Sequence, residues 1–176
     1  GHGTVAGDSL EMEYKDWEGI VRYGVNSFKK ETTISDLYLV GFSTGTSLAI
    51  KYMKDNPAVS GEPREDKIKG LVLVSTAVKA KTGAAWLAPI VKWFKDWADV
   101  YKEKDAARYE SFSFNAGAEF YKLTKGMVDP EYALDVPVLM AVSADDETID
   151  AKAARKYFCY PTNVKRRALV WYQSID

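Results

Sequence analysis

The chain has 176 residues, of which 47% are hydrophobic and 28% are charged, and its formal net charge is −1. This composition is typical of one globular domain with a sizeable core, and the charge gives no electrostatic basis for binding nucleic acid or an anionic membrane. The single cysteine, Cys159, excludes an intrachain disulfide and a cysteine-based metal site, and it is compatible with a reducing compartment such as the cytoplasm.

The first thirty residues predict a loop followed by a helix. Gly1-His2-Gly3-Thr4 is a glycine-rich stretch typical of a loop. Because the sequence starts with glycine rather than methionine, we expect a piece of a longer protein, with any targeting segment upstream of it. From about Glu11 to Lys30 apolar residues recur at helical spacing, which predicts an amphipathic helix.

The next stretch contains the most informative motif. Residues Asp36 to Phe42 have the pattern of a strand, and Thr44 to Lys54 have the apolar spacing of a helix. Between them Gly41-Phe42-Ser43-Thr44-Gly45 matches G-x-S-x-G, the nucleophile elbow, in which a tight turn raises a serine from the end of a strand. The pattern alone matches by chance in about one chain in twenty of this length, so the flanking strand and helix carry the assignment.

The elbow assigns two candidate roles. Ser43 is the candidate nucleophile, and the backbone N–H of Thr44, at the start of the helix, is the candidate oxyanion donor. We expect glycine to be required at positions 41 and 45, because a Cβ at either would collide with the neighbouring strand or helix.

The remaining strands predict the fold class. Two nearly continuous apolar runs, Ile68–Ser75 and Val136–Ser143, have the pattern of strands buried on both faces of a parallel sheet. Residues Asp150 to Phe158 predict a helix, and Arg167 to Tyr172 predict a fourth strand. Strands that alternate with helices indicate an α/β fold with a parallel sheet.

One segment interrupts this alternation. About sixty residues between Ser75 and Asp135 contain no clear central strand, too many for an ordinary connection. Helical spacing is visible from Ala84 to Lys102 and from Ala116 to Lys125. A helical insertion over the strand ends would form a lid on an apolar pocket, although its aromatic residues can equally anchor it to the sheet. The candidates for lining such a pocket are Trp86, Trp93, Trp97, Phe112 and Phe120.

A serine nucleophile needs a base, and the base needs a carboxylate that orients it; in the elbow fold the order is Ser, then Asp or Glu, then His. Asp145 and Asp146 follow a buried strand directly, where a sheet offers side chains to a site. We prefer Asp146, with Asp145 as second choice; an acidic loop that caps the next helix is the alternative. The only histidine, His2, precedes the serine, so we expect the catalytic histidine beyond Asp176.

These motifs resemble the α/β-hydrolase superfamily, in the branch of serine aminopeptidase-like, monoacylglycerol lipase and lysophospholipase hydrolases. The first four residues look like the end of a "PGHGT" loop, Leu39–Gly45 like the elbow, and Tyr109–Thr124 like the lid of bacterial members. Pro137–Ile149 looks like the strand that carries the acid, which falls on Asp146. The resemblance implies a partial hydrolase domain over residues 1–176 with a lid insertion at about 76–135, lacking the first strands, the upstream oxyanion donor and the histidine.

We therefore expect a fragment of a serine hydrolase that cleaves carboxylic esters through an acyl-enzyme, with a small acyl-ester or lipid-like substrate and neither a metal nor an organic cofactor. Amide cleavage is less favoured, and the fragment alone is expected to be inactive. The alternative is a non-catalytic hydrolase-like module that binds a ligand or a protein through its aromatic insertion. A histidine after the last strand of the parent gene would favour the enzyme. No apolar run approaches the length of a transmembrane helix.

Overall fold

The computed structural model describes residues 6–82, 85–98, 112–128, 134–159 and 166–174. Their elements in chain order are α1 (Asp8–Glu11), α2 (Tyr14–Lys30), β1 (Leu37–Phe42), α3 (Thr44–Asp55), β2 (Ile68–Val74), the 3₁₀ helix η1 (Ala85–Leu87), α4 (Ala88–Val91), β3 (Trp97–Ala98), β4 (Phe112–Ser113), α5 (Phe114–Thr124), β5 (Val138–Ser143), α6 (Ala151–Cys159) and β6 (Arg167–Tyr172).

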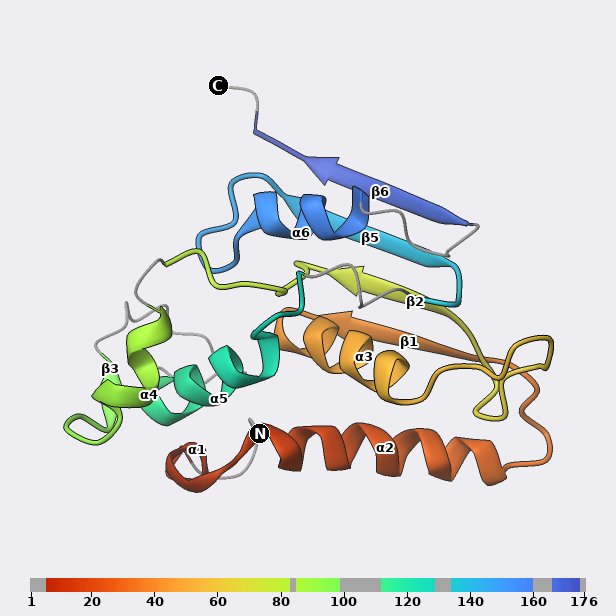
Figure 1. Ribbon diagram of the computed structural model, residues 1–176, viewed down its shortest axis with the longest axis horizontal. Coiled ribbons are helices and arrows are strands. Elements are labelled where there is room, and N and C mark those ends of the chain that lie inside the picture. Colours follow the sequence, from red (N-terminus) through yellow and green to blue (C-terminus); the bar gives the residue numbers. More distant parts are fainter. Residues whose placement is uncertain (1–5, 83–84, 99–111, 129–133, 160–165, 175–176) are drawn as a thin grey trace.

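The main sheet has four parallel strands in the order β1-β2-β5-β6. Its strands are in register near their carboxyl ends, since Phe42 pairs with Val74, Val74 with Ala141, and Ala141 with Val170. Helices α3 and α6 lie on one face of the sheet, and α2 packs beside α3 (Figure 1). A parallel sheet flanked by helices is the predicted fold class, and the structure confirms it.

The core lies between the sheet and these helices. Leu71 and Leu73 of β2 and Met140 of β5 are almost fully buried, in one cluster with Ile50 of α3 and Tyr157 of α6. Leu71 and Leu73 are two positions apart in β2, so their side chains point to the same face of the sheet. None of the helices in the described ranges is long and apolar enough to cross a membrane.

The opposite face of the sheet carries exposed apolar side chains. Tyr38, Val40 and Phe42, which alternate along β1, are 64%, 73% and 72% exposed, and Val170 of β6 is 54% exposed. Leu139 of β5 is also exposed. The expectation of central strands buried on both faces is therefore met only in part, because no described helix covers this second face.

The segment between β2 and β5 differs from the prediction in its first half. The predicted helix Ala116–Lys125 is present as α5, but the predicted helix Ala84–Lys102 is helical only in the first half of its described part, as η1 and α4. Helix α4 ends at Val91, and Trp97–Ala98 form β3, which pairs antiparallel with β4. Trp93, in the turn after α4, is 79% exposed. Helix α4 packs against α5, but the apolar residues Trp93 and Phe94 that follow it are exposed, so burial does not stabilise a longer helix there.

The bare sheet face gives a first prediction. Replacing Val40 and Val170 together by lysine should change the free energy of unfolding by no more than about 1 kcal/mol, because both side chains are exposed. The same change should lower binding of the apolar dye ANS, since it divides a contiguous apolar patch. Urea denaturation and ANS fluorescence measure the two effects.

Leu39→Lys is the matched control, because Leu39 packs against the core cluster and a lysine there should destabilise the protein by several kcal/mol, on the order of 3. Unchanged dye binding and a large loss of stability in the double variant would mean that this face is covered in solution.

Candidate active site

Ser43 lies in the strained turn that the sequence predicts. It joins β1 directly to α3, with φ 50° and ψ −122°, a backbone conformation that residues other than glycine rarely adopt. Its N–H donates to the carbonyl of Val74 at 3.0 Å, which ties the turn to the end of β2. The Ser43 hydroxyl makes no capping hydrogen bond to α3, so it is not used to start that helix.

The turn is held by two buried hydroxyl groups of α3. Thr46 Oγ1 donates to the carbonyl of Ser43 at 2.6 Å and accepts from the N–H of Ala77 at 2.9 Å. Ser47 Oγ donates to the carbonyl of Ala77 at 2.6 Å. These bonds fix the first turn of α3 against the segment that follows β2, and they offset the strain at Ser43. Sequence reasoning missed both residues; the available signal was two adjacent hydroxyls one turn into an apolar helix.

The two glycines of the motif differ. A Cβ on Gly41 would lie 2.7 Å from the Gly45 carbonyl oxygen and from the Thr46 nitrogen, both backbone atoms. Glycine is therefore required at position 41, as predicted. A Cβ on Gly45 would meet no described atom within 4 Å, so the steric expectation for Gly45 is wrong. The reason is that this side of α3 faces no described strand or helix.

The start of α3 supplies backbone donors beside the serine. Thr44 and Gly45 occupy the first positions of the helix, where N–H groups have no intrahelical acceptor. These groups and the helix dipole favour negative charge at this end of α3. Thr44 follows Ser43 directly, which is the position that an oxyanion donor needs.

Asp146 is held at both carboxylate oxygens. Its Oδ1 accepts the N–H groups of Thr148 at 2.8 Å and Ile149 at 2.9 Å, and its Oδ2 accepts the hydroxyl of Ser75 at 2.6 Å. Partial burial acts to raise the pKa of Asp146, but the hydrogen bonds from Ser75, Ile149 and Thr148 outweigh it and hold the pKa below its ordinary value. The carboxylate is therefore ionised at neutral pH.

Asp145 bonds in the opposite direction along the sheet edge. Its Oδ2 accepts both the N–H of Ser174, at 2.9 Å, and the Ser174 hydroxyl, at 2.8 Å. These two bonds lower the pKa of this exposed carboxyl. Ser174 follows β6, whereas the Ser75 partner of Asp146 follows β2, so Asp146 is the aspartate on the side of the serine's strand.

The sheet register relates Ser43 to Asp146. The serine follows β1, the aspartate follows β5, and β2 lies between these strands. Neighbouring strands are about 4.8 Å apart, so the two strand ends lie roughly 10 Å apart along one edge, a gap that an imidazole can bridge. The only histidine, His2, lies outside the described residues.

The aromatic candidates of the insertion fall into two groups. Trp86 and Trp93 are more than half exposed and Phe112 is about half exposed, whereas Phe120 packs against the core cluster and Trp97 is half-buried in β3. Helix α5 packs against α1, α2, α3 and α4, so it is anchored on the helical layer. Phe120 thus acts as an anchor, and the role of the other four in a substrate pocket stays a prediction.

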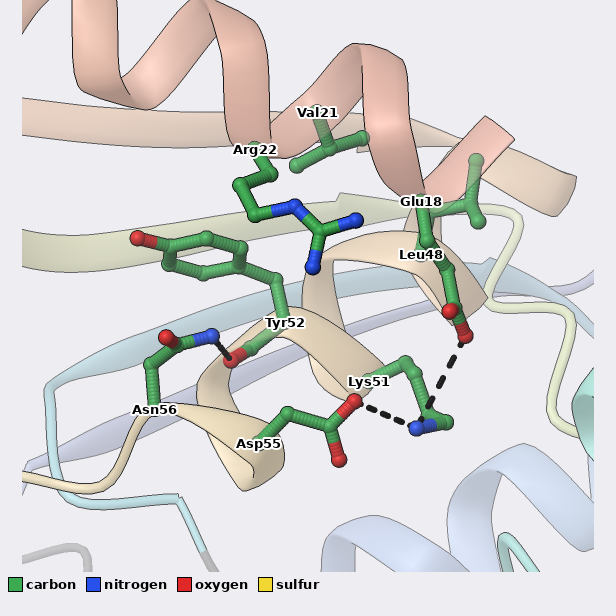
Figure 2. A pocket seen from close by; sticks show the side chains of 8 residues that line it. All are labelled: Glu18, Val21, Arg22, Leu48, Lys51, Tyr52, Asp55 and Asn56. Carbon is green, nitrogen blue, oxygen red and sulfur yellow. Dashed lines mark hydrogen bonds and ion pairs between the residues drawn. The ribbon is translucent and has the colours of Figure 1, made fainter. Parts of the chain in front are cut away.

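A separate small pocket lies between α2 and α3 (Figure 2). Its volume is about 40 Å³, enough for a few water molecules and too small for an acyl chain. Lys51 lies on one side, paired with Glu18 at 3.7 Å and with Asp55. Arg22 and Tyr52 lie on the other side (Figure 2). The pocket follows the later turns of α3, away from Ser43, so we do not assign it to the reaction. No group of three or more metal-ligating side chains occurs in the described ranges.

Comparison with known proteins gives matches only in structure. No protein-family model matches the sequence, and no curated protein matches it. One of the metagenome-derived lipolytic enzymes LipS and LipT matches 97% of this chain and 68% of its own length, with a TM-score of 0.77 and 14% identity. The monoacylglycerol lipase of Paleococcus ferrophilus matches 93% of this chain and 66% of its own length, with a TM-score of 0.70 and 18% identity. A monoglyceride lipase variant from Saccharomyces cerevisiae matches 91% of this chain and 59% of its own length, with a TM-score of 0.67 and 16% identity.

These neighbours, together with an alpha/beta hydrolase domain-containing protein from mouse, show the fold. The chain has the α/β-hydrolase fold, as predicted, and it spans 59% to 68% of the length of the first three neighbours, so it corresponds to part of that fold.

The glycine geometry gives a second prediction. Gly41→Ala should lower the free energy of unfolding by about 3 kcal/mol or more, because the new methyl group meets backbone atoms that cannot move without displacing α3. Gly45→Ala is the matched control, and it should leave stability unchanged or raise it by up to about 1 kcal/mol through helix propensity. Urea denaturation of the two variants makes the comparison. Equal effects would contradict the close approach of β1 to α3.

Proposed function

We propose that this chain carries the nucleophile and the acid of a serine hydrolase that cleaves carboxylic esters. One observation carries the proposal: Ser43 sits in a strained strand-to-helix turn, and Asp146 lies two strands away on the same edge of the sheet. The likeness in fold to lipases and esterases supports it. The roles of Ser43, Asp146 and Thr44 are part of the proposal.

In this mechanism Ser43 Oγ attacks the ester carbonyl while its proton passes to a histidine that Asp146 orients. The carbonyl oxygen becomes an oxyanion, which the N–H of Thr44 binds together with a second donor. The intermediate collapses, the alcohol leaves with the proton from the histidine, and an acyl-enzyme remains on Ser43. Water, deprotonated by the same histidine, then attacks the acyl carbonyl, and the bond from the acyl group to Ser43 Oγ breaks as the histidine returns that proton to the serine and the acid leaves. The sequence holds no histidine after Ser43, so the proposal requires a histidine from outside these 176 residues.

The substrate class in the proposal is a small acyl ester or a lipid-like ester. Two neighbours are named as lipases of monoacylglycerol or monoglyceride, and another, Est1E from Butyrivibrio proteoclasticus, was determined with ferulic acid bound. Exposed aromatic residues of the insertion, among them Trp86, Trp93 and Phe112, offer apolar surface to an acyl chain.

The third prediction tests the nucleophile. The product of the complete gene should hydrolyse a short-chain nitrophenyl ester, and Ser43→Ala should lower kcat by at least about 10³-fold, with Asp146→Asn lowering it by about 10⁴-fold. Ester hydrolysis is followed by absorbance, with folding checked by circular dichroism. The 176-residue chain alone should show no rate above that of its Ser43→Ala variant, because it lacks the histidine. A Ser43→Ala variant as active as the parent would refute the mechanism.

The second candidate function is a non-catalytic module that binds a ligand or a protein through the insertion. The observation in its favour is the exposure of Trp93 and of its neighbour Phe94, which is 87% exposed. Ester hydrolysis that depends on Ser43 excludes this alternative. Absence of hydrolysis by the complete gene product would favour it.

The fourth prediction separates binding aromatics from anchoring ones. Trp93→Ala should change the free energy of unfolding by no more than about 0.5 kcal/mol, but in the complete protein it should raise KM several-fold, by about 3-fold or more, for longer acyl chains. Phe120→Ala is the matched control and should cost about 2 kcal/mol or more, because Phe120 packs against the core. An unchanged preference for acyl-chain length in Trp93→Ala would remove this residue from the substrate site.

A further inference from the structure

We propose that Ser75 is a positioning residue for Asp146: its hydroxyl fixes the carboxylate in the direction from which it orients the catalytic base. This inference rests on the proposed function and adds to it a residue that neither the motif nor the fold comparison assigns. Ser75 follows β2, the strand between those that carry the nucleophile and the acid.

The contact is short and directed. Ser75 Oγ donates to Asp146 Oδ2 at 2.6 Å, within the range of hydroxyl-to-carboxylate hydrogen bonds, which are stronger than neutral ones. The two residues are 71 positions apart in sequence, so the bond joins two loops that are distant along the chain. It is the only side-chain partner of the Asp146 carboxylate in the described residues.

The bond completes the fixation of the carboxylate. Two backbone N–H groups of the same loop bind Oδ1, so they fix the position of one carboxylate oxygen. The Ser75 hydroxyl binds Oδ2 and fixes the position of the other oxygen. Each carboxylate oxygen has two lone pairs. Because Ser75 occupies one lone pair of Oδ2, the other stays available to an imidazole N–H, and the position of Ser75 sets the direction in which that second lone pair points.

The backbone of Ser75 has a positive φ, like that of Ser43. Both serines have φ 50°, and both follow adjacent strands of the sheet. The N–H of Ser75 donates to the carbonyl of Ala141 at 2.9 Å, which locks the residue to the end of β5. A non-glycine residue persists in this conformation only where its surroundings determine it, and such residues cluster at functional sites.

A short ladder extends the contact between the two loops. Ala80 and Ile149 form an antiparallel bridge, the N–H of Lys81 donates to the Thr148 carbonyl at 3.0 Å, and the N–H of Asp150 donates to the Lys79 carbonyl at 2.9 Å. We call residues 75–81 and 146–150 the acid ladder. Through it, the segment after β2 positions the acid loop along its whole length.

The charged groups around Asp146 have to be counted in any titration. Lys81 Nζ donates to the Asp146 backbone carbonyl at 2.6 Å, and its charge helps to lower the pKa of the side chain. Asp145 and Glu147 flank it in the sequence, and Lys79 pairs with Asp150 at 3.5 Å in the ladder. None of these groups is altered by a substitution at Ser75.

The experiment uses two variants that remove the same hydroxyl but differ in backbone strain, Ser75→Ala and Ser75→Gly. The carboxyl carbon of Asp146 is titrated by ¹³C NMR in the 176-residue chain and assigned with Asp146→Asn. We expect the pKa of Asp146 to rise toward its ordinary value by the same amount in both variants. Ser75→Gly should be the more stable of the two in urea, because glycine accepts φ 50° without strain.

Ser143→Ala is the control, since the Ser143 hydroxyl accepts from the N–H of Asp145 at 3.3 Å and is not bonded to the Asp146 carboxylate. It should leave the pKa of Asp146 unchanged. An unchanged pKa in both Ser75 variants, or a rise only in the less stable one, would overturn the proposal.

In the complete protein, Ser75→Ala should lower kcat roughly 10- to 100-fold with KM unchanged, the loss expected for one hydrogen bond to a charged group. A fall in kcat/KM that comes from KM alone would also overturn the proposal. The titration needs no turnover, so its outcome is independent of the proposed function, which Ser43→Ala tests separately.

Discussion

The parallel register of three strands is the constraint on which the candidate site depends. Because Phe42, Val74 and Ala141 pair in one row, β1 and β2 end at the same level and β5 ends two residues further on, so the residues that follow the three strands lie along one edge. Ser43, Ser75 and Asp146 thus come together although they are far apart in the sequence. Main-chain hydrogen bonds across the ends, from Ser43 to Val74 and from Ser75 to Ala141, continue the ladder one step beyond the strands.

Hydroxyl groups, together with buried apolar residues such as Ala77, Val78 and Ile149, hold this edge in place. Thr46 and Ser47 bind the backbone of Ala77, so the elbow is tied to the segment after β2. Ser75 ties the same segment to Asp146. Each of these bonds gives a buried or partly buried polar group a hydrogen-bond partner; without it the unpaired group would lower the stability of the fold. The segment after β2 is therefore bonded on one side to the helix that starts at the serine and on the other to the acid loop.

The sequence was sufficient for features with a local cause. The four parallel strands, the helix after Ser43 and the requirement for Gly41 follow from apolar patterning and from one tight turn, and the structure has them. Features that depend on distant partners were not accessible. The bond between Ser75 and Asp146 spans 71 positions, and no pattern in either loop indicates it. The predicted helix from Ala84 stops at Val91 for a related reason, since the apolar residues Trp93 and Phe94 beyond it are exposed and have no buried contact among the described residues to stabilise a longer helix.

The acid ladder has a consequence for motion. Residues 75–81 lead out of β2 toward the insertion, and the bridge of Ala80 to Ile149 and the bond from Lys81 to Thr148 are their last links to the acid loop. A hinge for the insertion at this end therefore has to lie beyond Lys81, because an earlier pivot would break the ladder. If the insertion moves to admit the substrate of the proposed function, it can do so while the carboxylate keeps its orientation. In that mechanism the ladder keeps the geometry that the chemistry requires apart from any movement of the insertion.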